Sequence, residues 1–286
     1  MKSYIPSVNS LSGGKTSSYL AANYPADIDI FSMVVSDCHN SNHKFTRDKK
    51  LVQKVNDKIL QHSVNKNEVV STPEDVNTIK VIFELEQFTG REIKWVRGQS
   101  FEELIKNKSA IPNQAMRFCT FNLKIIPIFE YLQSYQHHLV DMRIGYRYDE
   151  QERKEKFTTD IKYIDSVNLF GEGRNNWKTI KWRNGSFPLI ENGIIHPDVI
   201  NFWKPYSNFI FPEDSNCQMC FWKQGQQLRK NFDTNPSIMK WASVQEVIQG
   251  NTFKKEMSLL QVAKIGLQLD FMFGTGSGCS AGMCTD

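Results

Sequence analysis

A pair of glycines separates the first apolar run of the chain from its first helical stretch. The segment from Val8 to Leu20 reads VNSLSGGKTSSYL. Glycines let backbone N–H groups approach an anion, the N-terminus of the following helix adds partial positive charge, and Lys15 adds a full one. The segment therefore predicts a strand, a phosphate-binding loop and a helix, with the loop formed by Ser12, Gly13, Gly14, Lys15, Thr16 and Ser17. A plain capped turn, in which Ser12 and Thr16 only satisfy helix N–H groups, would explain part of the cluster.

Short β-rich runs and longer amphipathic stretches alternate through the first half of the chain, which is the pattern of βαβ units around a parallel sheet. Leu51, Val55 and Ile59 recur at helical spacing among lysines, which predicts an amphipathic surface helix. Strands are predicted at 4–11, 28–37, 68–70, 92–98 and 139–146, and helices at 16–24, 45–62, 76–88 and 118–135. The strand at 139–146 is expected to close the sheet, and Pro127 is expected to start or kink the last of these helices.

The second half of the chain is expected to be mainly helical and to contain most of the cysteines. Residues 147–181 are polar and predict a mobile loop or insertion near the site, 196–203 predict a helix, and 253–269 are amphipathic. The end of the chain, 274–286, is too rich in glycine for regular structure. We expect a Rossmann-like α/β core over residues 1–150 and a cysteine-containing part over residues 151–286, packed together as one unit.

Composition limits the class of protein. The 35 basic and 31 acidic residues leave a formal net charge of +4, which neither demands nor excludes nucleic acid. The N-terminus lacks the apolar run of a secretory signal, and no stretch approaches the roughly 20 apolar residues that cross a bilayer. We expect a cytoplasmic protein with no membrane partner. In that reducing compartment, its six cysteines are expected as thiols or metal ligands rather than as disulfides.

The spacing of the glycine loop differs from that of the Walker loop and of the dinucleotide-binding loop. It resembles the PP-loop, S-G-G-x-[DT]-S, of the adenine nucleotide alpha hydrolase superfamily, with Thr16 where many members carry Asp. Four later segments resemble motifs of the phosphoadenosine phosphosulfate reductase family, in that family's order: RFCTFNLKIIPIFEYL, RIGYRYDEQER, FPLIENGIIHPDVINFW and NCQMCFWK. The closing GMCTD is similar to the tails of phage and mobile-element members.

This resemblance implies a fold of the PP-loop ATP pyrophosphatase type, in which the loop grips the β and γ phosphates of ATP together with Mg²⁺. It implies that Gly145 lies at the nucleotide and that Asp37 accepts hydrogen bonds from the adenosine. Arginine suits bidentate phosphate recognition, and the carboxyl ends of parallel strands meet at a shared crevice. The residues expected to act in catalysis are Lys15, Arg117, Lys124, Arg147 and Arg153. Asp149 and Glu150 are expected either to pair with these arginines or to hold Mg²⁺.

Cys217 and Cys220 form a C-x-x-C pair, which can reach one iron–sulfur cluster from a single turn. Cys119, in a matched segment, is the third candidate ligand, and Cys284 or Cys279 is the fourth. The resemblance to the iron–sulfur branch, which includes the DNA phosphorothioation enzyme, favours a 4Fe–4S cluster. Zinc would accept the same four thiolates, and inert buried thiols are a further alternative. A third alternative is that Cys279 or Cys284, in the tail, carries a persulfide.

The resemblance implies an ATP-binding enzyme that adenylates an acceptor, releases pyrophosphate and couples this step to sulfur transfer. Nucleic acid is the implied acceptor, and a sulfur-donor protein such as a cysteine desulfurase is the implied partner. Reduction of phosphoadenosine phosphosulfate or adenosine phosphosulfate is one alternative, although the E-C-G-x-H segment of such reductases is absent. A non-catalytic nucleotide-binding subunit of a modification or defence complex is another. Trp177 and Trp182, in the polar segment, are candidates for stacking on a base.

Overall fold

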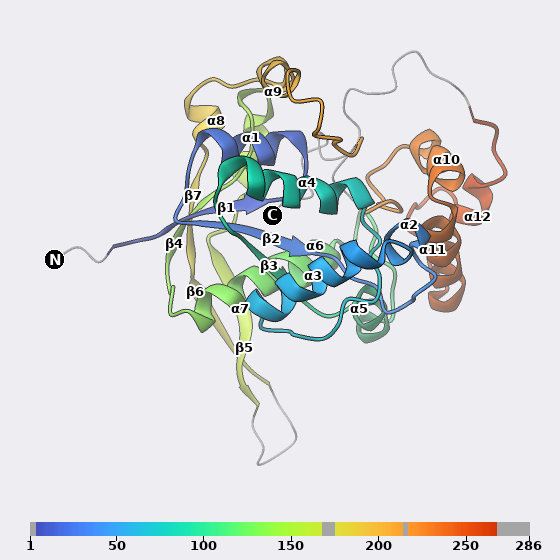
Figure 1. Cartoon of the computed structure of the whole chain (residues 1–286). Coiled ribbons are helices and arrows are strands. Elements are labelled where there is room, and N and C mark those ends of the chain that lie inside the picture. The colour runs from blue at the N-terminus through green and yellow to red at the C-terminus, as the bar shows by residue number, and fades with distance from the viewer. Residues whose placement is uncertain (1–3, 168–174, 214–216, 268–286) are drawn as a thin grey trace.

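A five-stranded sheet forms the centre of the computed structural model, which describes residues 4–167, 175–213 and 217–267. The strand order is β3-β2-β1-β4-β7, and all neighbouring strands are parallel. The strands are β1 (Ser7–Leu11), β2 (Ile28–Met33), β3 (Ile93–Arg97), β4 (Val140–Arg143) and β7 (Arg183–Ser186). Helices flank the sheet on both faces (Figure 1), which confirms the predicted Rossmann-like α/β fold.

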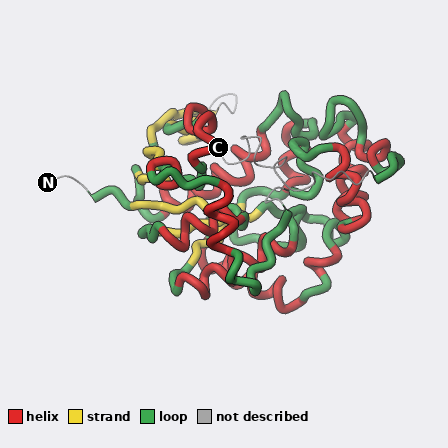
Figure 2. Tube along the Cα trace, turned by 90° about the horizontal axis from the view of Figure 1, so that it is seen from above, coloured by secondary structure: helices red, strands yellow, loops and turns green. Residues whose placement is uncertain are grey.

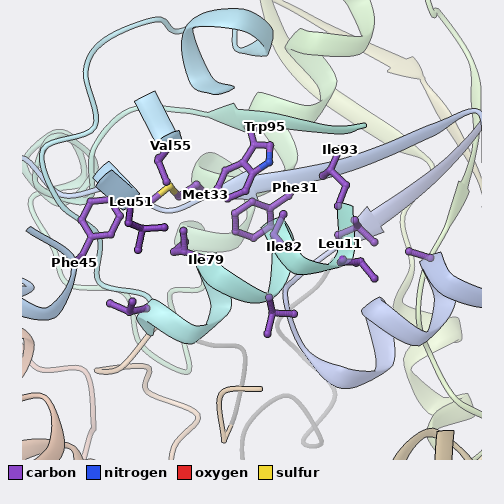
Figure 3. Packing of buried hydrophobic residues seen from close by; sticks show 14 of the residues in the cluster. Leu11, Phe31, Met33, Phe45, Leu51, Val55, Ile79, Ile82, Ile93 and Trp95 are labelled. Carbon is purple, nitrogen blue, oxygen red and sulfur yellow. The ribbon is translucent and has the colours of Figure 1, made fainter. Parts of the chain in front are cut away.

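Four helices pack over the face of the sheet that carries Phe31 and Trp95. They are α1 (Lys15–Asn23), α3 (Lys49–His62), α4 (Val76–Thr89) and α9 (His196–Trp203). Leu51 and Val55 of α3 lie in the same buried cluster as Phe31 and Trp95 (Figure 3), as their helical spacing predicts. This cluster holds α4 against the end of β1, where the glycine loop begins.

The opposite face of the sheet is covered by α7 (Ile126–Ser134), which follows α6 (Phe118–Thr120) and a π-helical turn, η1 (Phe121–Ile125). The predicted helix at 118–135 is therefore three consecutive helical segments. Pro127 lies in the first turn of α7, directly after the π-helical turn, so it falls where one helical segment gives way to the next.

The polar segment after β4 contains more regular structure than the sequence suggests. It forms a 3-10 helical segment, η2 (Tyr148–Lys156), and an antiparallel ribbon of β5 (Asp160–Val167) and β6 (Asn175–Lys181). The prediction that 139–146 closes the sheet is wrong, because β7 pairs with the free edge of β4. The sequence of β7, RNGS, has no apolar run that would mark it as a strand.

A second mismatch concerns the chain between α3 and α4. Residues 68–70 are not a strand, and the neighbouring Ser71 forms an isolated antiparallel bridge with Ser36. Two short helices complete the connections in the described chain, α2 (His43–Thr46) and α8 (Pro188–Glu191).

Away from the sheet, the described residues at one end of the molecule form helices and loops (Figure 2). The helices there are α5 (Phe101–Lys108), α10 (Gly225–Thr234), α11 (Pro236–Gln249) and α12 (Leu259–Val262), and their apolar side chains share one buried cluster. Within the described part of the amphipathic stretch at 253–269, the helix is α12, and α11 is a helix that the sequence analysis does not predict. The glycine-rich end, 274–286, lies outside the described residues.

The two halves of the chain share both the sheet and the buried clusters. β7 belongs to the second half, and Trp203 of α9 donates its indole N–H to the carbonyl of Lys15 at 2.9 Å. Val34 and Phe101 pack in one cluster with Met219. Among the helices of the described ranges, none has the length and apolar character needed to cross a membrane.

Candidate functional site

The glycine loop lies between the carboxyl end of β1 and the first turn of α1. Gly13 adopts a left-handed conformation, with φ of +72°, and packs against Thr78 of α4. A Cβ at this position would lie 2.6 Å from Cγ2 of Thr78, so a side chain does not fit. Gly14 is the N-cap of α1, and no side chain caps the helix there. The first turn of α1 therefore keeps its N-terminal N–H groups available to an anion.

The hydroxyl of Ser17 holds the loop in shape. It accepts the backbone N–H of Ser12 at 3.1 Å and donates to the carbonyl of Gly14 at 3.1 Å. The hydroxyl oxygen of Ser12 lies 3.1 Å from the hydroxyl oxygen of Ser17. Ser17 is buried, whereas Lys15 is exposed and Thr16 is half-buried. Lys15 and Thr16 are therefore the loop side chains that a ligand can reach.

The segment after β4 packs directly on the glycine loop. A Cβ at Gly145 would lie 3.4 Å from the backbone of Ser17 and from the carbonyl of Thr16, so this contact is close. Arg147 donates from Nη1 to the hydroxyl of Thr16 at 3.1 Å. The structure thus brings together the loop, Gly145 and Arg147, as the sequence predicts.

Two carboxylates position the arginines beside the loop. Arg147 donates from Nε to Asp149 at 3.0 Å, and its Nη2 lies 3.3 Å from Oε1 of Glu150. The same Glu150 oxygen accepts from Nη1 of Arg153 at 3.0 Å. Arg153 is buried, with its guanidinium 4.2 Å from the ring centroid of Tyr146. Asp149 and Glu150 thus pair with arginines, which is one of the two roles expected for them. Arg153 is the more deeply buried of the two arginines and contacts Arg147 through Glu150.

Lys124 belongs to a different part of the site. Its ammonium lies 3.4 Å from the carboxylate of Glu74, which is completely buried just before α4. Burial raises the pKa of Glu74, and the charge of Lys124 opposes that shift. Glu74 also accepts the backbone N–H of Val34 at 3.2 Å. Because Thr78 of α4 contacts Gly13, the segment around Glu74 connects the glycine loop with the cysteines.

Three of the predicted metal ligands line one small cavity. Its volume is about 50 Å³, and its polar lining includes Cys119, Cys217, Cys220 and Lys124. Burial raises the pKa of Cys119 to about 11 and that of Cys217 well above the ordinary value. The Glu74 carboxylate contributes to the second shift. Without a cation, these sulfurs are protonated thiols at neutral pH.

The C-x-x-C turn is fastened to the chain just before α4. The backbone N–H of Gln218 donates to the carbonyl of Pro73 at 2.9 Å, and its side-chain amide donates to Asp75 at 3.1 Å. The N–H of Cys220 donates to the carbonyl of Cys217 at 3.0 Å, which closes the turn. Both cysteines are thereby directed from one turn toward the cavity that Cys119 lines.

The donor set fits a thiolate-bound metal, although the ligands are not in coordinating positions. In the described part of the chain, no three Cys, His, Asp or Glu side chains are grouped closely enough to hold a metal ion. Three soft sulfur donors around one cavity nevertheless suit iron–sulfur or zinc chemistry. The fourth predicted ligand, Cys284, and its alternative, Cys279, lie outside the described residues.

A larger cleft opens beyond the end of β2. Its volume is about 790 Å³, and it is lined by Asp37, Cys38, His43, Glu102, Trp241 and neighbouring residues. Glu102 organises its wall by accepting the hydroxyl of Ser36 at 2.7 Å and the indole N–H of Trp241 at 3.0 Å. The Asp37 carboxylate accepts the hydroxyl of Ser100. Asp37 thus lies at the carboxyl edge of the sheet, in a wide cleft.

Several residues of the matched and polar segments lie apart from the glycine loop. Arg117 is exposed immediately before α6. Arg143 donates to the carbonyl of Pro25 at 2.7 Å, beyond the opposite end of α1. Trp182 is fully buried beside Phe129, so the expectation that it could stack on a base is wrong, whereas Trp177 is exposed.

Sequence reasoning missed two organising carboxylates, Glu74 and Glu102. Both look like ordinary acidic residues beside a helix start, and their partners are distant in sequence. The Ser100–Glu103 capping box of α5 was a readable signal for the position of Glu102 within a first helical turn.

Comparisons of the chain with protein-family models, curated proteins and solved structures gave no match.

Proposed function

We propose that this protein binds ATP through the Ser12–Ser17 loop and uses it to adenylate an acceptor, as the resemblance to PP-loop enzymes implies. The observation that carries the proposal is the contact of Arg147 with Thr16 above an α1 N-terminus that no side chain caps. Lys15 and Arg147 add positive charge where the helix already favours an anion. A polyphosphate matches this arrangement better than a neutral ligand does.

In the proposed reaction, an oxygen of the acceptor attacks the α phosphorus of ATP. The bond between that phosphorus and the oxygen bridging to the β phosphate breaks, and pyrophosphate leaves with the bonding electrons. Lys15 and the loop N–H groups would stabilise the charge that develops on the pyrophosphate. Hydrosulfide then displaces AMP from the acceptor, a substitution that needs no oxidant or reductant.

The cysteine cavity would hold the metal group of this reaction. Cys119, Cys217 and Cys220 are the described residues that would bind it, and an iron–sulfur cluster, when bound, would supply or activate sulfide. The protein's own contribution is to gather these half-buried thiols around one cavity beside Lys124 and the Glu74 carboxylate. Cytoplasmic location, a nucleic acid acceptor and a cysteine desulfurase as sulfur donor belong to the same proposal. Release of hydrosulfide from the desulfurase's persulfide would require two thiols as reductant, which are oxidised to a disulfide.

Equilibrium binding of ATP with Mg²⁺ tests the loop, followed by exchange of labelled pyrophosphate into ATP with candidate acceptors present. We expect Lys15→Ala and Arg147→Ala each to weaken ATP binding by roughly 10- to 150-fold, since a hydrogen bond to a charged group contributes about 1.5–3 kcal/mol. Arg143→Ala is the matched control, because that arginine contacts carbonyls at the other end of α1. Equal binding by Lys15→Ala and the wild type would contradict the loop assignment.

Analysis of iron, sulfide and zinc in anaerobically purified protein tests the cysteine cavity. Cys217→Ser should lose the bound metal, because it removes one thiolate of the set. Cys38→Ser is the control, since Cys38 lines the separate cleft beyond β2. Full retention of metal by Cys217→Ser would show that the ligands lie elsewhere. Binding of ATP without pyrophosphate exchange for any acceptor would favour the non-catalytic nucleotide-binding subunit.

A further inference from the structure

The β5–β6 ribbon projects from the body of the protein, away from α1 and α9 (Figure 1). Its strands are antiparallel, so residues opposite each other point to the same side, and successive residues alternate between the two sides. One side is anchored: Ile161 is buried, and the ring of Tyr163 lies 5.1 Å from that of Phe129 in α7. The ribbon is therefore fixed to the body through one side and presents the other.

The presented side carries an exposed tryptophan between lysines. Trp177 is 56% exposed and lies opposite Ile164, which is 43% exposed. Lys162, two residues before Ile164, has its ammonium 5.5 Å from the centroid of the Trp177 ring. Lys181 alternates to the same side and is exposed as well. Tryptophan is enriched at binding interfaces, where its ring supplies a large apolar contact area.

The charge of the ribbon indicates the kind of partner. On the presented side, Lys162 and Lys181 stand against one described acidic residue, Asp160, which lies opposite Lys181, whereas Lys178 lies opposite Tyr163 on the anchored side. Lysines beside an open aromatic face are what an unpaired nucleotide requires, because the ring stacks on the base and the ammonium groups attract the phosphates. A duplex conceals the faces of its bases inside the stack, so it could use the lysines but not the indole.

We propose that the outer side of the β5–β6 ribbon binds single-stranded nucleic acid through Trp177, Lys162 and Lys181. This inference rests on the proposed function in one respect: the acceptor in that function would be nucleic acid. The ribbon would bind one part of the nucleic acid, away from the glycine loop, while another part of the same nucleic acid reaches that loop.

Fluorescence anisotropy with a labelled oligothymidylate of about 16 nucleotides, without ATP, tests the proposal. We expect Trp177→Ala to weaken binding by roughly 5- to 150-fold, the loss that follows removal of one base-stacking ring, and Trp177→Phe to retain most of the affinity. Tyr135→Ala, a change at another exposed aromatic residue, should have no effect.

The lysines are tested through salt dependence. Lys162→Ala/Lys181→Ala should lower the slope of log affinity against log salt by about 1.4, because each phosphate contact on a single strand contributes about 0.7. Lys49→Ala/Lys50→Ala removes the same charge from exposed positions of α3 and should leave the slope unchanged. Thermal unfolding of each variant checks that the fold is retained.

Three results would overturn the inference. The wild type could fail to bind the oligonucleotide at low salt, Trp177→Ala could bind as tightly as the wild type, or Trp177→Ala could lose affinity for duplex as much as for single strands. The proposed function fails separately, because ATP binding by Lys15→Ala is measured without oligonucleotide. A protein that binds the oligonucleotide but not ATP would retain the ribbon proposal and lose the loop assignment.

Discussion

At the scale of single residues, Gly13 makes the strictest demand on the chain. Its φ of +72° disfavours any residue with a side chain, and a Cβ would meet Thr78 at 2.6 Å. We predict that Gly13→Ala destabilises the protein by about 2–5 kcal/mol, from a left-handed backbone cost of about 1–2 and an overpacking cost of about 1–3. Urea unfolding measures the change, and ATP binding should fall with it because the loop must shift.

Gly90 provides a control that separates the two costs. It has φ of +63° at the end of α4, and a Cβ there would meet nothing within 4 Å. Gly90→Ala should therefore cost only the backbone part, about 1–2 kcal/mol. Equal destabilisation by the two substitutions would show that the contact with Thr78 is unimportant.

At the scale of elements, β1 is fastened at its start as well as at its loop. The Asp27 carboxylate, just before β2, accepts the hydroxyl of Ser7 at 2.6 Å and that of Tyr4 at 2.6 Å. The hydrogen bond from Ser7, followed by that from Tyr4, lowers the pKa of Asp27 from 3.8 to about 2. Stability from this group is therefore present above pH 3.8 and is lost as the pH falls toward 2.

Asp27→Asn should remove this acid-dependent part of the stability. Because Asp27 is exposed, we expect the loss at neutral pH to stay below about 1 kcal/mol, and the difference from wild type to shrink below pH 3. Unfolding in urea between pH 2 and 7 measures it. Asp57→Asn, on the exposed side of α3, is the control, and a difference from wild type that grows toward low pH would contradict the assignment.

Periodic and capped elements could be predicted, whereas elements defined by their partners could not. The spacing of Leu51, Val55 and Ile59 predicts α3, and the glycines before a helix predict the loop. β7 is a strand only because β4 offers it an edge. The same holds for the site, since the chain brings Arg147 to Thr16 and Glu74 to Lys124 across long separations that no local pattern encodes.

At the scale of the whole molecule, the two predicted parts depend on each other. A fragment that ends at residue 150 would lack β7 and would expose the cluster that Met219, Leu228 and Met239 complete. We predict that the full chain unfolds in one thermal transition, because these clusters share residues of both parts. Circular dichroism at two wavelengths and calorimetry measure it. Two separated transitions, or a cooperative transition in the fragment, would show that the parts fold independently.

The order of the strands also matters while the protein is being made. β4 leaves the ribosome well before β7, and at about 5–20 residues per second the delay is roughly 2 to 9 s. During that interval the N–H and C=O groups along one edge of β4 have no partner strand. A ribosome that stalled between the two strands would carry a nascent chain whose sheet still has an open edge at β4, available to pair with a neighbouring chain.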